Sequence, residues 1–101
     1  MEVNEHKARV DAARGLRART ILEDELVKEG FKALESAYVA AWRSTTIDDV
    51  AGREKLFLAI NILGKVQHHL SAIIADGKLA EADLRELAQA AERKKAWHEV
   101  R

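Results

Sequence analysis

The chain has 101 residues, of which 48% are apolar and 34% are charged, and its 17 basic and 17 acidic side chains cancel to a net charge of zero. This composition is typical of one folded domain and excludes a disordered chain. The zero net charge excludes bulk attraction to a polyanion. Cysteine is absent, which excludes disulfides and thiolate metal sites, and proline is absent, which favours long helices. We expect a single all-α domain spanning residues 1–101.

The first segment, residues 1–19, is a polar and partly basic arm whose alanines make it competent to form a helix. We expect a helix over residues 20–43, either separate from the arm or continuous with it. Its start has two candidate signals. The sequence TILE at Thr20–Glu23 matches a capping box, and Asp24 is the alternative cap.

The apolar residues of this helix fall on one face, at the alternating spacings of three and four that helix packing requires. They are Leu26, Val27, Phe31, Leu34, Ala37, Tyr38, Ala41 and Trp42. A strip of small residues lies beside this face and lets another backbone approach closely. The strip is made of Gly30, Ala33, Ala37 and Ala40.

The sequence STTIDD forms the first turn, with Thr46 or Asp48 as the cap of a second helix that we expect over residues 46–75. Gly77 then predicts a helix stop, because glycine readily takes the left-handed conformation that ends helices. A third helix is expected over residues 79–101. Three helices with short connections predict an antiparallel three-helix bundle, built on a long helical hairpin and preceded by the polar arm.

The second helix carries an unusually apolar stretch, LFLAINILGKV. With Leu56 as the reference, its apolar side chains occupy an arc of roughly 160° on a helical projection. They are Leu56, Ala59, Ile60, Ile62, Leu63, Val66, Leu70, Ile73 and Ile74. An arc this wide is typical of a middle helix that contacts a neighbour on each side, so we expect these residues in the core.

Further residues fall outside the predicted core faces and are candidates for an oligomer or partner contact. They are Val39, Phe57, Leu58, Gly64 and Trp97. Phe57 and Leu58 flank the polar strip of the second helix, and Gly64 forms a shallow groove beside Phe57. Several exposed apolar residues on adjacent helices indicate docking, so we expect a homo-oligomer. The alternative for Trp97 is that it folds back on the first helix.

No arrangement of residues predicts catalysis, a cofactor or a metal site. His68 and His69 are adjacent, so on a helix they point about 100° apart and cannot share one metal ion. The segment IADGKLAEAD offers only Asp76 and Asp83, whereas a calcium loop needs many oxygen ligands. We therefore expect a protein that is not an enzyme and that binds no cofactor.

Two groups of basic residues are candidates for contact with nucleic acid or phosphate. They are Lys7, Arg14 and Arg17 in the arm, and Arg93, Lys94, Lys95 and Arg101 near the last residue. The second group has an alternative explanation, because cations also suit the negative end of a helix. Acidic neighbours dilute the arm and no helix-turn-helix is evident, so DNA contact is a weaker expectation than self-association.

Three features occur together between Ala18 and Leu84: an aromatic end to the first helix, GRE at the entry to the second, and GKLA at the predicted stop. Their residues are Tyr38, Ala41, Trp42, Gly52–Glu54 and Gly77–Ala80. With them, the chain resembles small helical proteins of tailed bacteriophages and prophages from the DNA-packaging and virion-assembly region. The resemblance implies a compact relative of the small terminase subunit, a helical, ring-forming protein that holds DNA near a packaging motor. The chain departs from fuller members because it has no separate DNA-binding domain, and the resemblance assigns no catalytic residue.

The resemblance thus implies a non-enzymatic, oligomerising phage-type protein that aids DNA packaging or virion assembly, with phage packaging or virion proteins as partners. No apolar run reaches the length of a membrane span, and the first residues lack the apolar segment of a signal peptide. We therefore expect a location in the host cell cytoplasm or in the virion, with no membrane partner. The second hypothesis is a small helical inhibitor or adaptor that binds a single host protein through Trp97 and the Phe57–Leu58 flanks.

Overall fold

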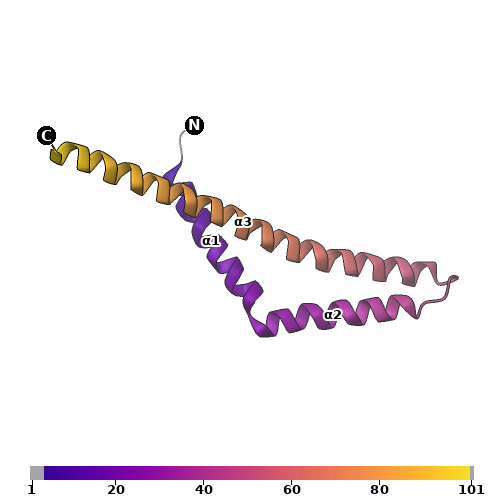
Figure 1. Ribbon diagram of the computed structural model, residues 1–101. Helices are drawn as coiled ribbons and strands as arrows, with labels where there is room; N and C mark the ends of the chain where they lie inside the picture. Colours follow the sequence, from indigo (N-terminus) through magenta and orange to yellow (C-terminus); the bar gives the residue numbers. More distant parts are fainter. Residues whose placement is uncertain (1–3, 101) are drawn as a thin grey trace. The chain divides into compact units, whose positions relative to one another are not determined.

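The computed structural model describes residues 4–100, and within that range it contains three α-helices and no β-strand. The helices are α1 (Glu5–Glu23), α2 (Glu25–Arg43) and α3 (Val50–Val100), shown in Figure 1. The predicted all-α class is confirmed. The lack of proline explains why the helices are long, since no residue in them removes a backbone hydrogen bond.

Residues 5–19 of the polar arm lie in helix α1. The helix starts after Asn4, whose side-chain oxygen accepts a hydrogen bond from the backbone N–H of Lys7 at 3.0 Å. Such a bond satisfies one of the N–H groups that a helix start leaves without an intrahelical partner. Thr20–Glu23 forms the last turn of α1, so the predicted helix start at Thr20 is wrong.

Asp24 separates α1 from α2. Its backbone is extended, and its carboxylate accepts hydrogen bonds from the N–H groups of Leu26 at 2.9 Å and Val27 at 3.1 Å. The alternative cap predicted at Asp24 is therefore confirmed. Helix α2 ends at Arg43, the residue predicted as the last of residues 20–43.

Helix α3 begins one residue after Asp49, whose carboxylate accepts a hydrogen bond from the N–H of Gly52 at 3.0 Å. Asp49 is thus the cap, and the predicted caps Thr46 and Asp48 are wrong by one to three positions. The predicted start of the helix at residue 46 is early for the same reason, because residues 44–49 form the turn.

Helix α3 then continues for 51 residues without interruption. The helices predicted over 46–75 and 79–101 are therefore one element, to the extent that the chain is described. Gly77 lies inside this helix, and no glycine among residues 4–100 has a positive φ angle. The predicted helix stop at Gly77 is wrong.

Contacts group the described residues into two units. Within the described range, unit 1 comprises residues 4–18 and residues 72–100, and unit 2 comprises Arg19–Ser71. The expectation of a single domain over residues 1–101 stays a prediction.

Unit 1 contains a crossing of α1 and α3 at which two glycines touch. A methyl group added to Gly15 would lie 2.8 Å from the Cα atom of Gly77, and one added to Gly77 would lie 2.7 Å from the Cα atom of Gly15. The two backbones are therefore in direct contact. This contact, and not a helix end, explains why residue 77 is a glycine. Alanines surround the crossing, and Leu84 packs against them. The buried alanines are Ala8, Ala12, Ala18 and Ala80.

Unit 2 is a helical hairpin in which α2 and residues 50–71 of α3 lie side by side and run in opposite directions (Figure 1). The Arg53 guanidinium lies over the ring of Trp42, 5.1 Å from its centroid, and donates a hydrogen bond to the Thr45 hydroxyl at 3.2 Å. These contacts fix the register near the turn. The side chains that line the seam are half-buried, and no residue of unit 2 is fully buried. The seam includes Val27, Phe31, Tyr38, Trp42, Leu56, Ile60, Leu63 and Leu70.

Part of the predicted core is exposed in unit 2. Ile62 and Val66 are 58% and 44% exposed, and Leu26 and Leu34 of α2 are 76% and 45% exposed. The wide apolar arc was predicted for a helix with a neighbour on each side. Within unit 2, helix α3 has one neighbour, α2, so only the half of the arc that faces α2 is covered.

Candidate interaction surfaces

The predicted contact residues lie at the surfaces of their units. Phe57 and Leu58 are 58% and 53% exposed in unit 2, and Trp97 is 61% exposed in unit 1. Gly64 is exposed and has open space beside its Cα atom, whereas Val39 is half-buried. The indole ring of Trp97 meets the ring of the adjacent His98 edge to face, with the centroids 6.2 Å apart.

The hairpin of unit 2 has two sides, and the predicted contact residues are divided between them. In an antiparallel pair of right-handed helices, rotation in the same sense away from the contact line leads to the same side of the pair on both helices. On α3, Leu58, Ile62 and Val66 lie on one flank of the contact line, at four-residue steps. Phe57 and Gly64 lie on the other flank, so they do not share a side with Leu58.

The corresponding rotation on α2 leads to Gly30, Ala33 and Ala37 of the strip of small residues, which therefore lie on the same side as Ile62 and Val66. We call this side of unit 2 the apolar face. It consists of Leu26, Gly30, Ala33, Leu34 and Ala37 from α2, and Leu58, Ile62 and Val66 from α3. All of these residues are exposed. A contiguous exposed apolar surface of this kind indicates a contact with another protein.

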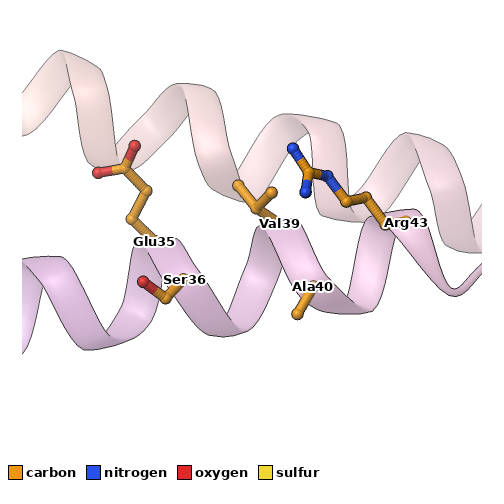
Figure 2. A pocket seen from close by; sticks show the side chains of 5 residues that line it. All are labelled: Glu35, Ser36, Val39, Ala40 and Arg43. Atoms are coloured by element: carbon orange, nitrogen blue, oxygen red, sulfur yellow. The ribbon is translucent and has the colours of Figure 1, made fainter.

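The opposite side of the hairpin is mostly polar. It carries Lys28, Lys32, Arg43, Asn61 and His68 beside Val39 and Phe57. Near its edge is a shallow hollow of about 580 Å³, lined by Glu35, Ser36, Val39, Ala40 and Arg43. Figure 2 shows that Val39 points toward α3 while Ala40 points away from it. A small-molecule site encloses most of its ligand's surface. This hollow cannot do so, because every side chain that lines it comes from one helix.

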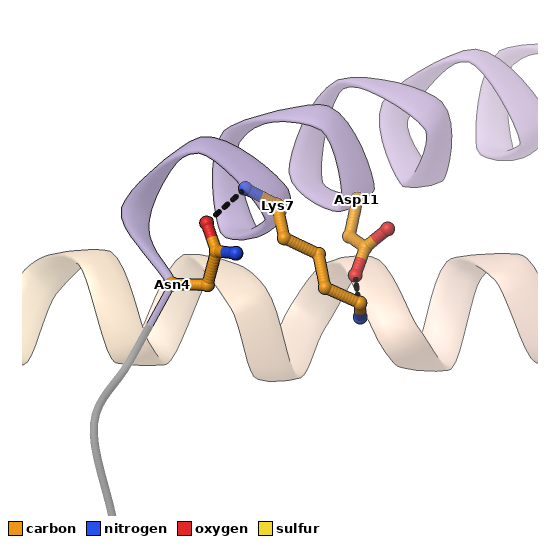
Figure 3. Close-up of polar contacts among 3 residues, drawn as sticks. All are labelled: Asn4, Lys7 and Asp11. Carbon is orange, nitrogen blue, oxygen red and sulfur yellow. Dashed lines mark hydrogen bonds and ion pairs between the residues drawn. The ribbon is translucent and has the colours of Figure 1, made fainter.

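The predicted phosphate-contact residues of the arm are exposed in α1. Lys7 forms an ion pair with Asp11, with Nζ and Oδ2 2.9 Å apart (Figure 3). The hydrogen bond from Lys7 to this carboxylate, and then its negative charge, raise the pKa of Lys7 above its ordinary value. Asp11 thus balances the positive charge of Lys7 locally, whereas Arg14 and Arg17 are exposed and have no ion-pair partner among the described residues.

The cations near the end of α3 are also at the surface. Arg93, Lys94 and Lys95 are exposed, and Arg93 borders a hollow of about 420 Å³ together with Arg85 and Glu86. Arg101, the remaining predicted phosphate contact, lies outside the described residues. The hollow beside Arg93 is open to solvent.

The possible metal ligands in residues 4–100 are His, Asp and Glu side chains. No group of three or more His, Asp or Glu side chains in that range lies close enough to hold a metal ion. His68 and His69 are both exposed on α3, and their side chains point about 100° apart. The described surface does carry exposed apolar side chains and exposed charges.

Sequence reasoning missed Ile62, Val66, Leu26 and Leu34 as surface residues, because it assigned them to the core. It did identify Leu58 and the strip Gly30, Ala33, Ala37 and Ala40. Helix geometry could have connected these residues. Once an antiparallel hairpin is assumed, the Leu58 flank of α3 and the small-residue flank of α2 must lie on the same side of it.

Comparison with protein-family models, with characterised proteins and with solved structures finds no match. The resemblance to phage packaging and assembly proteins therefore stays a prediction. Among the described residues, no helix combines the length and the apolar character required to cross a bilayer.

Proposed function

We propose that this protein is non-enzymatic and acts by self-association. The observation that carries the proposal is the distribution of apolar side chains. The buried apolar residues of the described chain are alanines, whereas the large side chains of the apolar face are 44% to 76% exposed. Small domains bury only part of their apolar surface and gain stability when a further copy covers the rest.

The proposed architecture of the assembly is an antiparallel helical bundle. The hairpin of unit 2 supplies two antiparallel helices, and further helices come from another copy. This arrangement accounts for the wide apolar arc of α3, because a helix with a second neighbour has both halves of such an arc covered.

The proposed setting is DNA packaging or virion assembly, in the host cell cytoplasm or in the virion. Its support is the resemblance of residues 18–84 to small phage proteins, among them compact small terminase subunits. Contact with DNA through Arg14, Arg17 and the cations Arg93–Lys95 is a secondary proposal, supported by their exposure. Phage packaging or virion proteins are the proposed partners.

The test is the mass of the purified chain in solution, with and without duplex DNA. We expect a discrete oligomer, and we expect any binding of DNA to weaken steeply as salt is raised, because cation–phosphate contacts release counterions. A single-chain mass at every concentration would contradict self-association. Binding of DNA that does not respond to salt would contradict the role of the exposed cations.

A second candidate function is that of an inhibitor or adaptor for one host protein. The observation that favours it is the 61% exposure of Trp97, since tryptophan is a frequent anchor of protein interfaces. This candidate predicts that one host protein is captured by the intact chain and lost with Trp97→Ala, while the oligomer mass is unchanged. Equal capture by both chains would contradict it.

A further inference from the structure

We propose that the apolar face of unit 2 binds the same face of a second copy, in a two-fold pair in which α2 of each copy packs against α3 of the other. The inference rests on the proposed self-association and adds the surface and the symmetry through which it occurs. The core of the pair is a bundle of four helices, two from each copy.

The shape of the face supports a pair of identical surfaces. The α2 half is a shallow strip, because Gly30, Ala33 and Ala37 project little or nothing beyond the backbone. The α3 half is a ridge of branched side chains, with Ile62 and Val66 one helical turn apart. A two-fold axis parallel to the helices places the ridge of one copy on the strip of the other, and does so twice, as an isologous interface requires.

The chain already contains one helix contact of this type. In unit 1, the small residues Ala8, Ala12 and Gly15 of α1 receive α3 so closely that the backbones touch at Gly77. The strip on α2 has a similar spacing of small residues, yet a side chain at Gly30 would meet nothing within 4 Å. The apolar face thus has the features of a helix-packing surface, but no helix of unit 2 packs on it.

The register of the hairpin places the centres of strip and ridge at the same level. Arg53 of α3 lies beside Trp42 of α2. Because both helices rise by about 1.5 Å per residue, equal numbers of steps back along α2 and forward along α3 bring Ala33 level with Ile62. Rotation about an axis parallel to the helices leaves levels unchanged, so Ala33 of one copy faces Ile62 of the other.

The borders of the face are complementary in charge. Glu29 lies at the outer edge of α2 and Lys65 at the outer edge of α3, within about one residue of the same level, and both are exposed. In the two-fold pair, Glu29 of each copy lies beside Lys65 of the other. Ala33 and Ile62 form the centre of the face, and the exposed Lys55 lies in line with Ile62, seven residues nearer the turn.

The area is sufficient for a pair. Helix α2 has 19 residues, so the face is about 28 Å long, and two helices make it about 20 Å wide. Its projection is therefore roughly 560 Å², and the relief of the side chains increases the accessible area. Stable complexes bury about 600 to 1,000 Å² on each partner. The projected area of the face is close to the lower end of that range, without a contribution from unit 1.

The first experiment measures the dissociation constant by sedimentation of the full chain and of two matched variants. Ile62→Glu places a charge on the face, and Phe57→Glu places one on the opposite side at a residue with the same 58% exposure. Glutamate is a good helix former, so both variants should keep their helix content. We expect Ile62→Glu to raise the dissociation constant by at least about 100-fold and Phe57→Glu to change it by less than about threefold.

A second variant, Ala33→Glu, repeats the test from α2 without removing a large side chain. An oligomer that survives both Ile62→Glu and Ala33→Glu overturns the inference while self-association stands. An oligomer that is lost with Phe57→Glu and kept with Ile62→Glu assigns the contact to the polar side and also overturns it. A wild-type chain that never associates contradicts the proposed function itself.

The second experiment tests the symmetry. The chain has no cysteine, so single substitutions give one thiol per copy. We expect oxidation of a mixture of Ala33→Cys and Ile62→Cys to link the two variants to each other, with little linkage when either is oxidised alone. Linkage of each variant with itself would place like helices together and overturn the proposed arrangement.

Discussion

Replacement of Gly77 by alanine tests whether the backbones of α1 and α3 touch in unit 1. In a roomy helix interior, this substitution stabilises the fold by about 1 kcal/mol, because alanine loses less conformational entropy on folding. At Gly77 the added methyl group would lie 2.7 Å from the Cα atom of Gly15 and 3.1 Å from the carbonyl oxygen of Asp11. Both are backbone atoms that cannot rotate away, so the two helices would have to separate.

Gly64 provides the matched control, because it lies in the same helix and has open space beside its Cα atom. We expect Gly64→Ala to raise the free energy of unfolding by about 1 kcal/mol. Gly77→Ala receives the same gain but loses about 1 to 3 kcal/mol to overpacking. The propensity gain cancels in the comparison, so Gly77→Ala should be less stable than Gly64→Ala by about 1 to 3 kcal/mol.

The assay is thermal unfolding of both variants at one shared protein concentration, followed by circular dichroism. For a chain of this length, about 1 kcal/mol corresponds to a shift in Tm of about 4–8 °C. The two variants should therefore differ by more than about 4 °C, with Gly64→Ala the higher. An equal or higher Tm for Gly77→Ala would refute the backbone contact at Gly15 and Gly77.

Three further predictions follow from individual contacts. Leu58→Asp, at the edge of the apolar face, should weaken the oligomer in sedimentation while helix content by circular dichroism stays unchanged; loss of helix content would mean that Leu58 belongs to the core. Asp24→Ala removes the acceptor of two backbone N–H groups and should cost about 1 kcal/mol of stability in thermal unfolding; an unchanged Tm would mean that the cap contributes nothing. Asp11→Ala should return the pKa of Lys7 toward its ordinary value, because the hydrogen bond and the negative charge that raise it are removed; an NMR titration of Lys7 that shows no decrease would contradict the ion pair.

The helical class, the end of α2 and the cap at Asp24 were predictable because each depends on neighbours within a few residues. Helix propensity and the absence of proline determine the first, and local hydrogen bonds determine the other two. The seam of α2 was also predictable in part, because the spacing of Val27, Phe31 and Tyr38 is a property of the helix itself.

The role of Gly77 was not predictable, because glycine serves equally as a helix end and as a point of close approach. The residue that decides between these roles is Gly15, which is far away in the sequence. The prediction that Ile62 and Val66 lie in the core was wrong for a related reason. A periodic pattern gives the width of an apolar surface, but it does not say whether the second neighbour comes from the same chain or from another.

The predicted contact residues of α3 fall on two different sides of the hairpin for a geometric reason. Phe57 and Leu58 are consecutive, so on a helix they point about 100° apart and lie on different sides of the hairpin. Both are exposed, but Leu58 shares its side with Ile62 and Val66, whereas the side of Phe57 is mostly polar and has Val39 and Val50 as apolar neighbours.

In the proposed assembly, a second copy covers the apolar face. Its five large side chains are 44% to 76% exposed, and full burial of such a side chain contributes about 2 kcal/mol. Covering the exposed half of these side chains in both copies thus contributes about 10 kcal/mol. Association costs at least about 4 kcal/mol, which leaves at most about 6 kcal/mol and a Kd no tighter than tens of micromolar.

The most direct test is the mass of the wild-type chain by sedimentation equilibrium between about 1 μM and 1 mM, a range that brackets this Kd. We predict a mass that rises with concentration to at least twice that of one chain. A mass that stays at that of one chain over the whole range would contradict the account.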